Sequence, residues 1–313
     1  MEVLSTIMKS LASSDNNVIV IDEELRALIQ KRLLVMLDDI ISVCSENNIR
    51  YMMSGGSCLG AVRHQGFIPW DDDIDLNMER AEFERFLPLF EEKYPDKYKV
   101  LVPGRDEETD YLFVHVVDRT VYARELMQKK YTDLGLFLDI FIIENVPNNK
   151  LLRNGHGFLC MLYRYIISCI RFYENREELS GFIENNPELK AFYDKRSRLG
   201  GIFQFIPKKK WLAAAFRTMG ICKDRSSTMV SIPSGSKQYF QEMYPRDSFC
   251  KTEKMRFQER DVEVSAWWDG YLRILYGNYM EIPPVEKRGQ HMFLELDVDA
   301  LKQAAGTGDD TLG

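Results

Sequence analysis

Acidic side chains spaced two residues apart are the first feature of this sequence that could do chemistry. Asp73 and Asp75 lie in the segment WDDDIDLNM, where polar and apolar residues alternate. If residues 73–78 form a strand, Asp73, Asp75 and Asn77 share one face, and the two carboxylates lie ~6–7 Å apart along it. Like charges this close raise each other's pKa unless a cation holds them, and hard divalent cations prefer carboxylate oxygens. The alternation favours a metal site, although a run of aspartates is also typical of a solvated acidic turn.

A third carboxylate lies in an otherwise apolar, strand-like run. Asp139 is the polar residue of GLFLDIFII, residues 135–143. Burying a lone ionised carboxylate is costly, so Asp139 needs a loop to cap, an arginine partner or a metal ion. Any of these would satisfy Asp139 by itself. Taken with Asp73 and Asp75, it completes a set of three candidate catalytic, metal-binding carboxylates, with Mg²⁺ or Mn²⁺ as the expected cofactor.

A glycine-containing turn precedes these carboxylates. Gly55, Gly56 and Ser57 stand between a short apolar segment and a short helical one, and glycines there expose backbone N–H groups that favour phosphate. A GGS segment alone is usually only a turn. Its position ahead of the aspartates predicts a donor-phosphate site, with Arg63 and His64 at the end of the short helix as further candidate contacts. Basic residues at a helix end often only interact with the helix dipole.

Helices and strands must alternate along the chain to position these residues. Asp22 can cap an amphipathic helix over 22–48, and Pro88 is expected to kink or shorten a helix over 79–93. The expected strands are 51–53, 73–78, 98–102, 111–117, 120–124 and 135–143. This order predicts an α/β (α+β) fold in which a mixed sheet with flanking helices forms a catalytic core over residues 1–148.

The rest of the chain differs in pattern from this core. Residues 149–235 lack strand alternation and are interpreted as a helical insertion or lobe. Residues 236–298 return to a mixed pattern, with a helix expected at about 261–277, and are expected to complete the site. Residues 299–313 read as a polar, disordered tail.

Composition narrows the function classes. The 313 residues carry 41 basic and 48 acidic side chains, a formal net charge of −7, which argues against a nucleic-acid partner. The six cysteines show no zinc-ligand spacing, which is typical of a reduced cytoplasmic protein. We expect no secretory signal and no membrane-spanning helix. A location in the cytoplasm, extending to the inner face of the cell membrane, is therefore expected, with at most peripheral membrane contact.

At these residues the chain resembles the LicD family, which includes bacterial phosphorylcholine transferases and fukutin-type transferases within the polymerase-β-like nucleotidyltransferase superfamily. The resemblance is carried by GGSCLGAVRHQGFIPWDDDIDL within residues 51–78, FLDIFIIENVP at 137–147 and YGNYMEIPPVEKRGQH at 276–291. It implies a nucleotidyltransferase-like fold, with Asp73 and Asp75 as the metal pair and Asp139 as the third carboxylate.

The resemblance also implies a reaction. A metal-dependent transferase of this kind moves a phosphocholine-like head group from a CDP conjugate to a sugar hydroxyl of a cell-surface glycan or its lipid-linked precursor, releasing CMP. Two alternatives stay open: a nucleotidyltransferase that releases pyrophosphate, and a non-catalytic nucleotide-binding protein of the same fold. Where many relatives have a lysine in a strand, this chain has His115.

Several further residues are candidate substrate contacts. Two adjacent tryptophans could enclose a quaternary ammonium by cation–π attraction, although such a pair in a helix is more often core. The run Lys208–Lys210 could touch a membrane surface or end a solvated helix. The candidate substrate contacts are Trp70, Asp71, His115, Trp267, Trp268, Arg288 and His291.

Overall fold

A mixed β-sheet positions the acidic residues. The structure, a computed structural model, describes residues 19–126, 128, 134–177, 179, 187–285, 288–289 and 291–306. In this part of the chain the sheet has seven strands in the order β1-β2-β6-β4-β3, extended from β6 through β7 and β8. Strands β2 and β6 are parallel and the other pairs are antiparallel. The strands are β1 (Met52–Met53), β2 (Asp75–Glu79), β3 (Tyr98–Leu101), β4 (Val114–Asp118), β6 (Phe137–Asn145), β7 (Met229–Ser231) and β8 (Met243–Pro245). The predicted α/β fold is confirmed.

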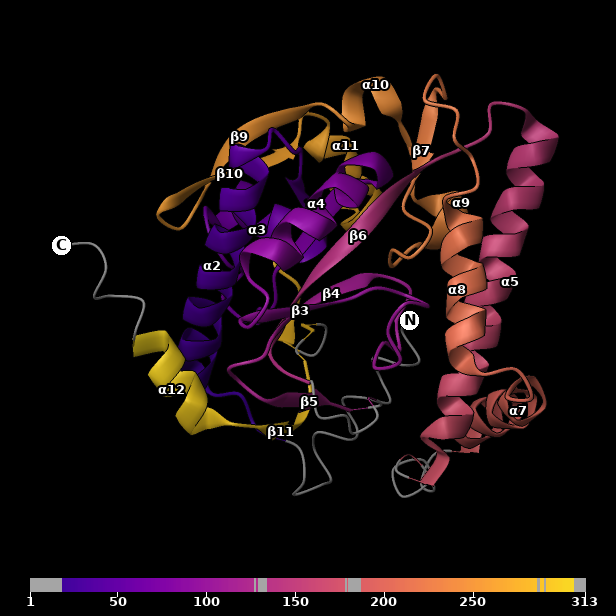
Figure 1. Cartoon of the computed structure of the whole chain (residues 1–313), viewed down its shortest axis with the longest axis horizontal. Helices are drawn as coiled ribbons and strands as arrows, with labels where there is room; N and C mark the ends of the chain where they lie inside the picture. The colour runs from indigo at the N-terminus through magenta and orange to yellow at the C-terminus, as the bar shows by residue number, and fades with distance from the viewer. Residues whose placement is uncertain are drawn as a thin grey trace.

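Two long helices, α2 (Glu23–Glu46) and α4 (Arg80–Lys93), pack beside each other and against strand β6 (Figure 1). Helix α2 begins where the sequence predicts, because the Asp22 carboxylate accepts a hydrogen bond from the Leu25 backbone N–H at 2.8 Å. Helix α4 contains Pro88 but continues to Lys93, so the proline does not shorten it.

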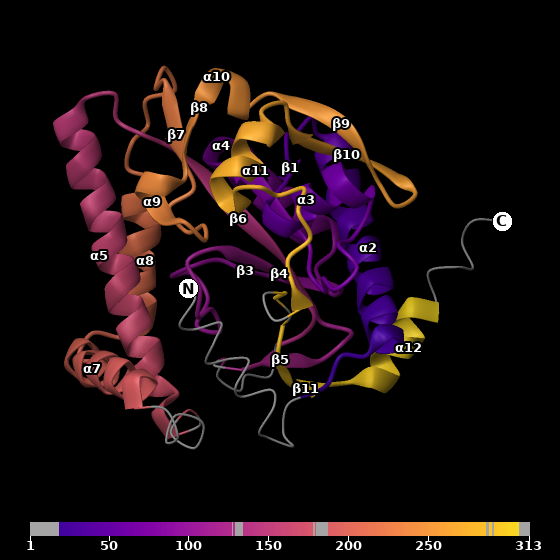
Figure 2. The same ribbon diagram turned by 180° about the vertical axis from the view of Figure 1, so that it is seen from behind.

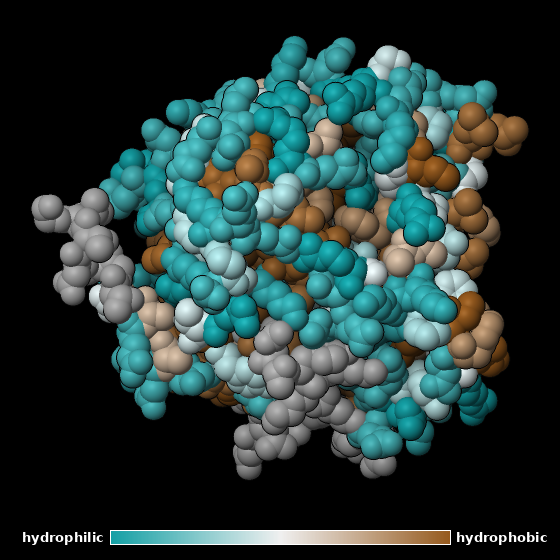
Figure 3. Space-filling view, in the orientation of Figure 1, coloured by the Kyte–Doolittle hydropathy of each residue, from teal (hydrophilic) through white to brown (hydrophobic). Residues whose placement is uncertain are grey.

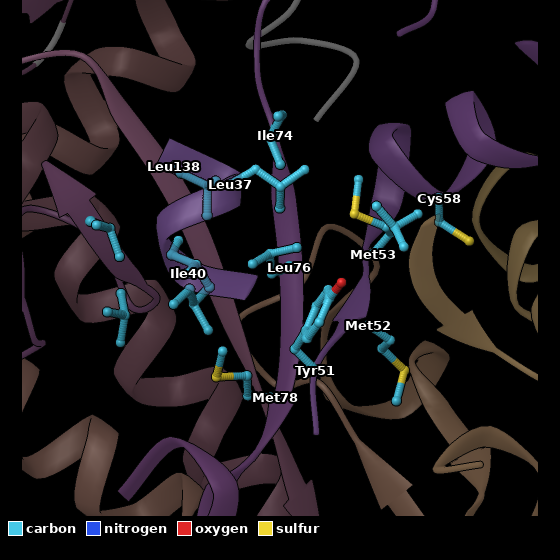
Figure 4. Close-up of a cluster of buried hydrophobic side chains, with 14 of the residues drawn as sticks. Leu37, Ile40, Tyr51, Met52, Met53, Cys58, Ile74, Leu76, Met78 and Leu138 are labelled. Carbon is cyan, nitrogen blue, oxygen red and sulfur yellow. The ribbon is translucent and has the colours of Figure 1, made fainter. Parts of the chain in front are cut away.

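Alternation along β2 separates an apolar face from a polar face of the sheet. Ile74, Leu76 and Met78 are fully buried in the core that α2 covers. Figure 4 shows Leu76 among Leu37 and other core side chains. Asp75 and Asn77, which alternate with these residues, belong to the opposite face. The period of two predicted from the sequence therefore separates the core from the polar residues in β2.

A helical lobe packs beside the sheet, as Figures 1 and 2 show from opposite sides. It consists of α5 (Lys150–Glu174), α7 (Pro187–Phe203) and α8 (Lys208–Met219), which lie within the predicted helical insertion. The predicted helical insertion or lobe over 149–235 also contains a strand, β7, which pairs with β6 and extends the sheet. A three-residue strand is too short to show alternation in the sequence.

The C-terminal part differs from the sequence prediction in two places. Residues 260–265 form β10, which pairs with β9 (Thr252–Phe257), so the helix predicted at 261–277 is present only as α11 (Trp268–Tyr276). Buried Val262 and Val264 alternate with more exposed neighbours, which is a strand pattern.

The expected disordered tail is also partly ordered. Residues Val298–Gly306 form α12, whose buried Leu301 and Ala305 are four residues apart, and α12 packs on α2. The prediction is therefore wrong for residues 299–306, and residues 307–313 lie outside the described part. Between α11 and α12, β11 (Phe293–Leu296) pairs with β5 (Ala123–Glu125) away from the main sheet.

Candidate active site

Asp75 and Asp139 lie side by side on the polar face of the sheet. They are direct partners in the parallel pairing of β2 with β6. The Asp139 backbone N–H also donates to the Ile74 carbonyl at 3.1 Å, which fixes the alignment of the two strands. Directly paired residues in neighbouring strands project from the same face of the sheet. Two of the three predicted carboxylates therefore come together from segments 64 residues apart in the chain.

Asp73 lies just ahead of β2, so the prediction that it belongs to this strand is wrong. Its Oδ1 is buried without a partner among the described residues. Burial raises the pKa of Asp73, with Asp72 adding to the rise and His291 opposing it. Asp73 still joins the acidic group, because its charge and that of Asp139 also raise the pKa of Asp75 beyond the effect of burial.

The glycine turn is pressed against these carboxylates. Gly55 has a φ of +47°, and a Cβ built on it would lie 3.0 Å from Asp75 Oδ2. A Cβ on Gly56 would lie 2.7 Å from Asp71 Oδ2. Helix α3 (Gly55–His64) therefore starts at the acidic group, and only glycine fits these two positions without displacing a carboxylate.

Ser57 and Tyr271 hold the turn in place. The Ser57 hydroxyl is buried and accepts a hydrogen bond from the Asp75 backbone N–H at 2.9 Å. The Tyr271 hydroxyl accepts from the Gly55 backbone N–H at 2.9 Å and lies 3.0 Å from Ser54 Oγ. Ser57, a predicted phosphate ligand, thus orients the start of β2. Tyr271 was not predicted, because a tyrosine in an apolar helix gives no signal of a contact with a distant turn.

His115 contacts Asp139 directly. The two residues are partners across β4 and β6, and His115 Nδ1 is within hydrogen-bonding distance of Asp139 Oδ1. The histidine is buried, and its Nε2 has no partner among the described residues. This arrangement fixes the orientation of Asp139 and leaves its Oδ2 for other contacts.

His291 lies among three acids. Its Nδ1 is 3.0 Å from Asp72 Oδ1, and its Nε2 is 3.6 Å from Glu125 Oε1 and 3.9 Å from Asp73 Oδ2. Burial disfavours the charged ring, but Glu125, Asp72 and Asp73 outweigh it and raise the pKa of His291 well above 6.5. The imidazolium therefore offsets part of the acidic charge. Glu125 was missed, because the β5–β11 pairing that brings it here has no local sequence signal.

A cavity of about 350 Å³ adjoins Asp71 and the start of α3. Five predicted site residues line it: Gly56, Arg63, Trp70, Asp71 and Arg288. The Arg288 guanidinium stacks 4.2 Å from the centre of the Trp70 ring. His64 is near this cavity through Arg63, whose Nε donates to His64 Nε2 at 2.9 Å. The volume is typical of a small-molecule site.

The two tryptophans of α11 lie elsewhere. Trp268 donates from Nε1 to Glu253 of β9 at 2.8 Å, and Trp267 packs near Gly270 and the Tyr244 ring. Neither lines the cavities described beside the aspartates. Trp267 is the N-cap of α11 and Trp268 its first residue, so the two side chains lie away from these two cavities, and the tryptophan box stays a prediction that neither cavity supports.

The acidic group fits a divalent cation in its donor chemistry. In the described part of the chain, no three His, Cys, Asp or Glu side chains are already placed as a metal-ligand set. Asp73 Oδ1 is nevertheless buried without a partner in the described part of the chain, and burial, together with mutual repulsion, raises the pKa of Asp71 and Asp75. A bound cation would relieve both costs. Carboxylate oxygens are the ligands that Mg²⁺ and Mn²⁺ prefer.

Known proteins similar to this chain carry the same domain. Residues 48–149 match the model of the LicD/FKTN/FKRP nucleotidyltransferase domain. The lipopolysaccharide cholinephosphotransferase LicD of Haemophilus influenzae is 27% identical over 266 residues, covering 84% of this chain and 94% of that protein. The human ribitol 5-phosphate transferase FKRP is 46% identical over 39 residues, which are 12% of this chain and 8% of that protein. The chain therefore carries a LicD/FKTN/FKRP nucleotidyltransferase domain around the acidic site and is similar to a LicD cholinephosphotransferase along most of its length.

Proposed function

We propose that the chain moves a phosphocholine-like head group from a CDP conjugate to a sugar hydroxyl of a cell-surface glycan or its lipid-linked precursor, and releases CMP. The observation that carries the proposal is the pairing of Asp75 with Asp139 beside the turn at Gly55 and Gly56. The Haemophilus relative, a lipopolysaccharide cholinephosphotransferase, supports the choice of head group and of a glycan acceptor.

Each part of the site has a role in this reaction. When bound by Asp73, Asp75 and Asp139, a divalent cation such as Mg²⁺ supplies charge neutralisation to the donor phosphates. The start of α3 orients the phosphates with its backbone N–H groups. The His291 imidazolium lies close enough to Asp73 to offset charge in the same region.

Asp139 is the base for the acceptor. His115 holds its Oδ1, and Oδ2 takes the proton of the sugar hydroxyl as that oxygen bonds to the transferred phosphorus and the bond from phosphorus to CMP breaks. The cavity of Arg63, Trp70 and Arg288 accommodates the nucleotide, since its aromatic and guanidinium groups can stack on a base and bind phosphate.

The leaving group tests the proposal. We expect the purified protein with Mg²⁺, CDP-choline and a glycan acceptor to release CMP, and Asp75→Asn to lower turnover roughly 100-fold or more while it stays folded. Asp261→Asn, the same change at an exposed position of β10, is the matched control. Release of pyrophosphate from CTP would instead indicate a nucleotidyltransferase. Nucleotide binding without release of CMP or pyrophosphate would indicate a non-catalytic protein. Wild-type turnover by Asp75→Asn would refute the assignment.

The acceptor chemistry also suggests where the chain acts. No helix in the described residues is long and apolar enough to cross a membrane. Helix α5 instead exposes an apolar stripe along one edge of the molecule, visible at the right of Figure 3. The exposed residues are Leu151, Leu152, Phe158, Leu159, Met161, Leu162 and Tyr165.

The charges of α5 indicate what covers the stripe. Between Lys150 and Tyr173 the helix carries Lys and Arg but no Asp or Glu, in a chain of net charge −7. Arg164 and Arg171 contact other parts of the fold, but Lys150 and Arg153 lie at the start of the helix beside the exposed stripe. An apolar face flanked by positive charge fits an anionic lipid surface. The stripe is a better candidate for membrane contact than the run at Lys208–Lys210. Lys208 forms ion pairs with Asp110 and Glu174, and Lys209 forms one with Glu107. Peripheral contact with the inner face of the cell membrane would bring the site to a lipid-linked acceptor.

A further inference from the structure

A second, smaller cavity adjoins the acidic group on the far side of the Gly55 turn from Asp71. Its volume is about 80 Å³, and its wall includes Gly55 and Asp75, whereas the larger cavity includes Gly56 and Asp71. Tyr276 lines both cavities. Since typical ligand pockets begin at roughly 300 Å³, the smaller cavity can take only one end of a ligand. The two cavities border the same turn and the same acidic group.

The β2–β6 pairing places this cavity next to the reacting centre. Asn77 pairs with Phe141 two residues after the pairing of Asp75 with Asp139, so Phe141 lies on the same face one step along the strands. That step is ~6–7 Å. This step is comparable in length to a two-carbon linker between a phosphate and an ammonium group, together with the contact distance from the ammonium group to the groups around it.

The walls of the small cavity suit a cation with apolar substituents. Phe141, Tyr271 and Tyr276 contribute aromatic rings, and Leu275 adds an aliphatic surface. Asp75 and Glu242 contribute carboxylates, and no Lys or Arg is among the described residues that line the cavity. Aromatic faces and a carboxylate are what a quaternary ammonium binds most strongly.

Glu242 is held at the wall of the small cavity without an ion pair to any other described residue. Its carboxylate accepts hydrogen bonds from the Lys237 backbone N–H at 2.5 Å and the Tyr244 hydroxyl at 3.2 Å. A Cβ on Gly235 would lie 2.3 Å from its Oε2, so the chain passes tightly around it. Among the described residues Glu242, which is only 2% exposed, forms no ion pair, and the charges of Arg164 and Lys237 act on it only from farther away. A buried carboxylate without a counter-ion is costly, and a cationic ligand would supply one.

We propose that this small cavity binds the cationic end of the transferred head group, with Phe141, Tyr271 and Tyr276 as its aromatic walls and Glu242 as its counter-ion. The inference rests on the proposed function, because it assigns the cavity to the same donor. It predicts that the chain selects CDP-choline over CDP-glycerol and CDP-ribitol by charge. Burial raises the pKa of Glu242 to about 7, and a bound cation would stabilise the ionised carboxylate.

The test compares donors that differ only in the head group. The probes are CDP-choline, its neutral 3,3-dimethylbutyl isostere and CMP, titrated calorimetrically with Mg²⁺ present. We expect the isostere to bind roughly 10-fold more weakly than CDP-choline, because cation–π and counter-ion contacts are lost while shape is kept. Glu242→Gln should abolish this difference and leave CMP affinity unchanged. Glu259→Gln, at an exposed glutamate, is the matched control.

Two further arms keep the test decisive. Phe141→Leu removes an aromatic wall without touching Glu242, and it should reduce the preference for choline if Glu242→Gln fails to fold. Equal affinity for CDP-choline and its isostere in the wild type would overturn the inference, even if CMP is released from CDP-choline. Absence of CMP release from any CDP conjugate would overturn the proposed function instead, so the two failures are distinguishable.

Discussion

The buried carboxylate of Glu242 predicts how the stability of the fold depends on pH. Burial is the main cause that raises its pKa from 4.5 to about 7. Hydrogen bonds from the Lys237 backbone and Tyr244, and weaker attraction from the Arg164 and Lys237 charges, oppose the rise. Tyr271 faces the same carboxylate from α11. Because the folded protein binds this proton more tightly than the unfolded chain, stability is greatest below the unfolded pKa. It is lost as pH rises through the folded pKa.

The size of the effect follows from the two pKa values. With 4.5 for the unfolded chain and about 7 for the fold, ionisation of Glu242 removes about 2.5 kcal/mol of unfolding free energy between about pH 5 and about pH 8. Glu242→Gln cannot ionise and keeps an oxygen that can accept from the Lys237 N–H. We therefore expect the variant to lose about 2.5 kcal/mol less than the wild type over this range.

Urea unfolding at the two pH values, followed by circular dichroism, measures this double difference. Other titrating groups contribute equally to both proteins and cancel, provided that the variant leaves the fold unchanged. Parallel pH profiles, within about 0.5 kcal/mol, would refute the claim that Glu242 is buried without a counter-ion. Glu259→Gln, at a side chain 88% exposed, should follow the wild type.

Two other substitutions test separate parts of the molecule. Gly56→Ala would place a methyl group 2.7 Å from Asp71 Oδ2 and should lower the rate of CMP release roughly 10-fold or more. Gly155→Ala, which has no atom within 4 Å of its Cβ, should leave the rate unchanged. Equal rates for the two variants would contradict the close packing of the turn. Phe158→Glu on the apolar stripe of α5 should reduce co-sedimentation with vesicles of anionic lipid several-fold, while Val20→Glu, also at an exposed apolar residue, should not. A stripe that instead joins two copies of the chain would show as a dimer that Phe158→Glu dissociates.

Local patterns in the sequence predict much of the sheet. The alternation through Ile74, Asp75 and Leu76 separates core residues from polar residues. Asp139 interrupts an apolar run, and the free-energy cost of burying a lone carboxylate there is enough to mark it as a candidate site residue. The alternation does not locate the first residue of the strand, because apolar Ile74 extends the pattern back to Asp73, which lies ahead of β2.

The rest of the site depends on pairing between distant segments. Glu125 reaches His291 because β5 pairs with β11, and the register of Phe293 with Glu125 is not encoded in either segment alone. Tyr271 occupies a core-like position in α11, so its hydrogen bond to Gly55 is visible only in three dimensions. Local patterns place residues on faces, but tertiary packing decides which faces meet.

One pairing register carries both the reaction and the choice of donor. The parallel alignment that sets Asp75 beside Asp139 also sets Asn77 beside Phe141, so the carboxylates and the aromatic wall cannot move independently. A slip of one residue would send these side chains into the core and bring apolar ones to the polar face, at the cost of burying charge. The apolar face under α2 therefore fixes the active site indirectly. Substitutions there should change turnover and head-group selectivity together, whereas Glu242 should change selectivity alone.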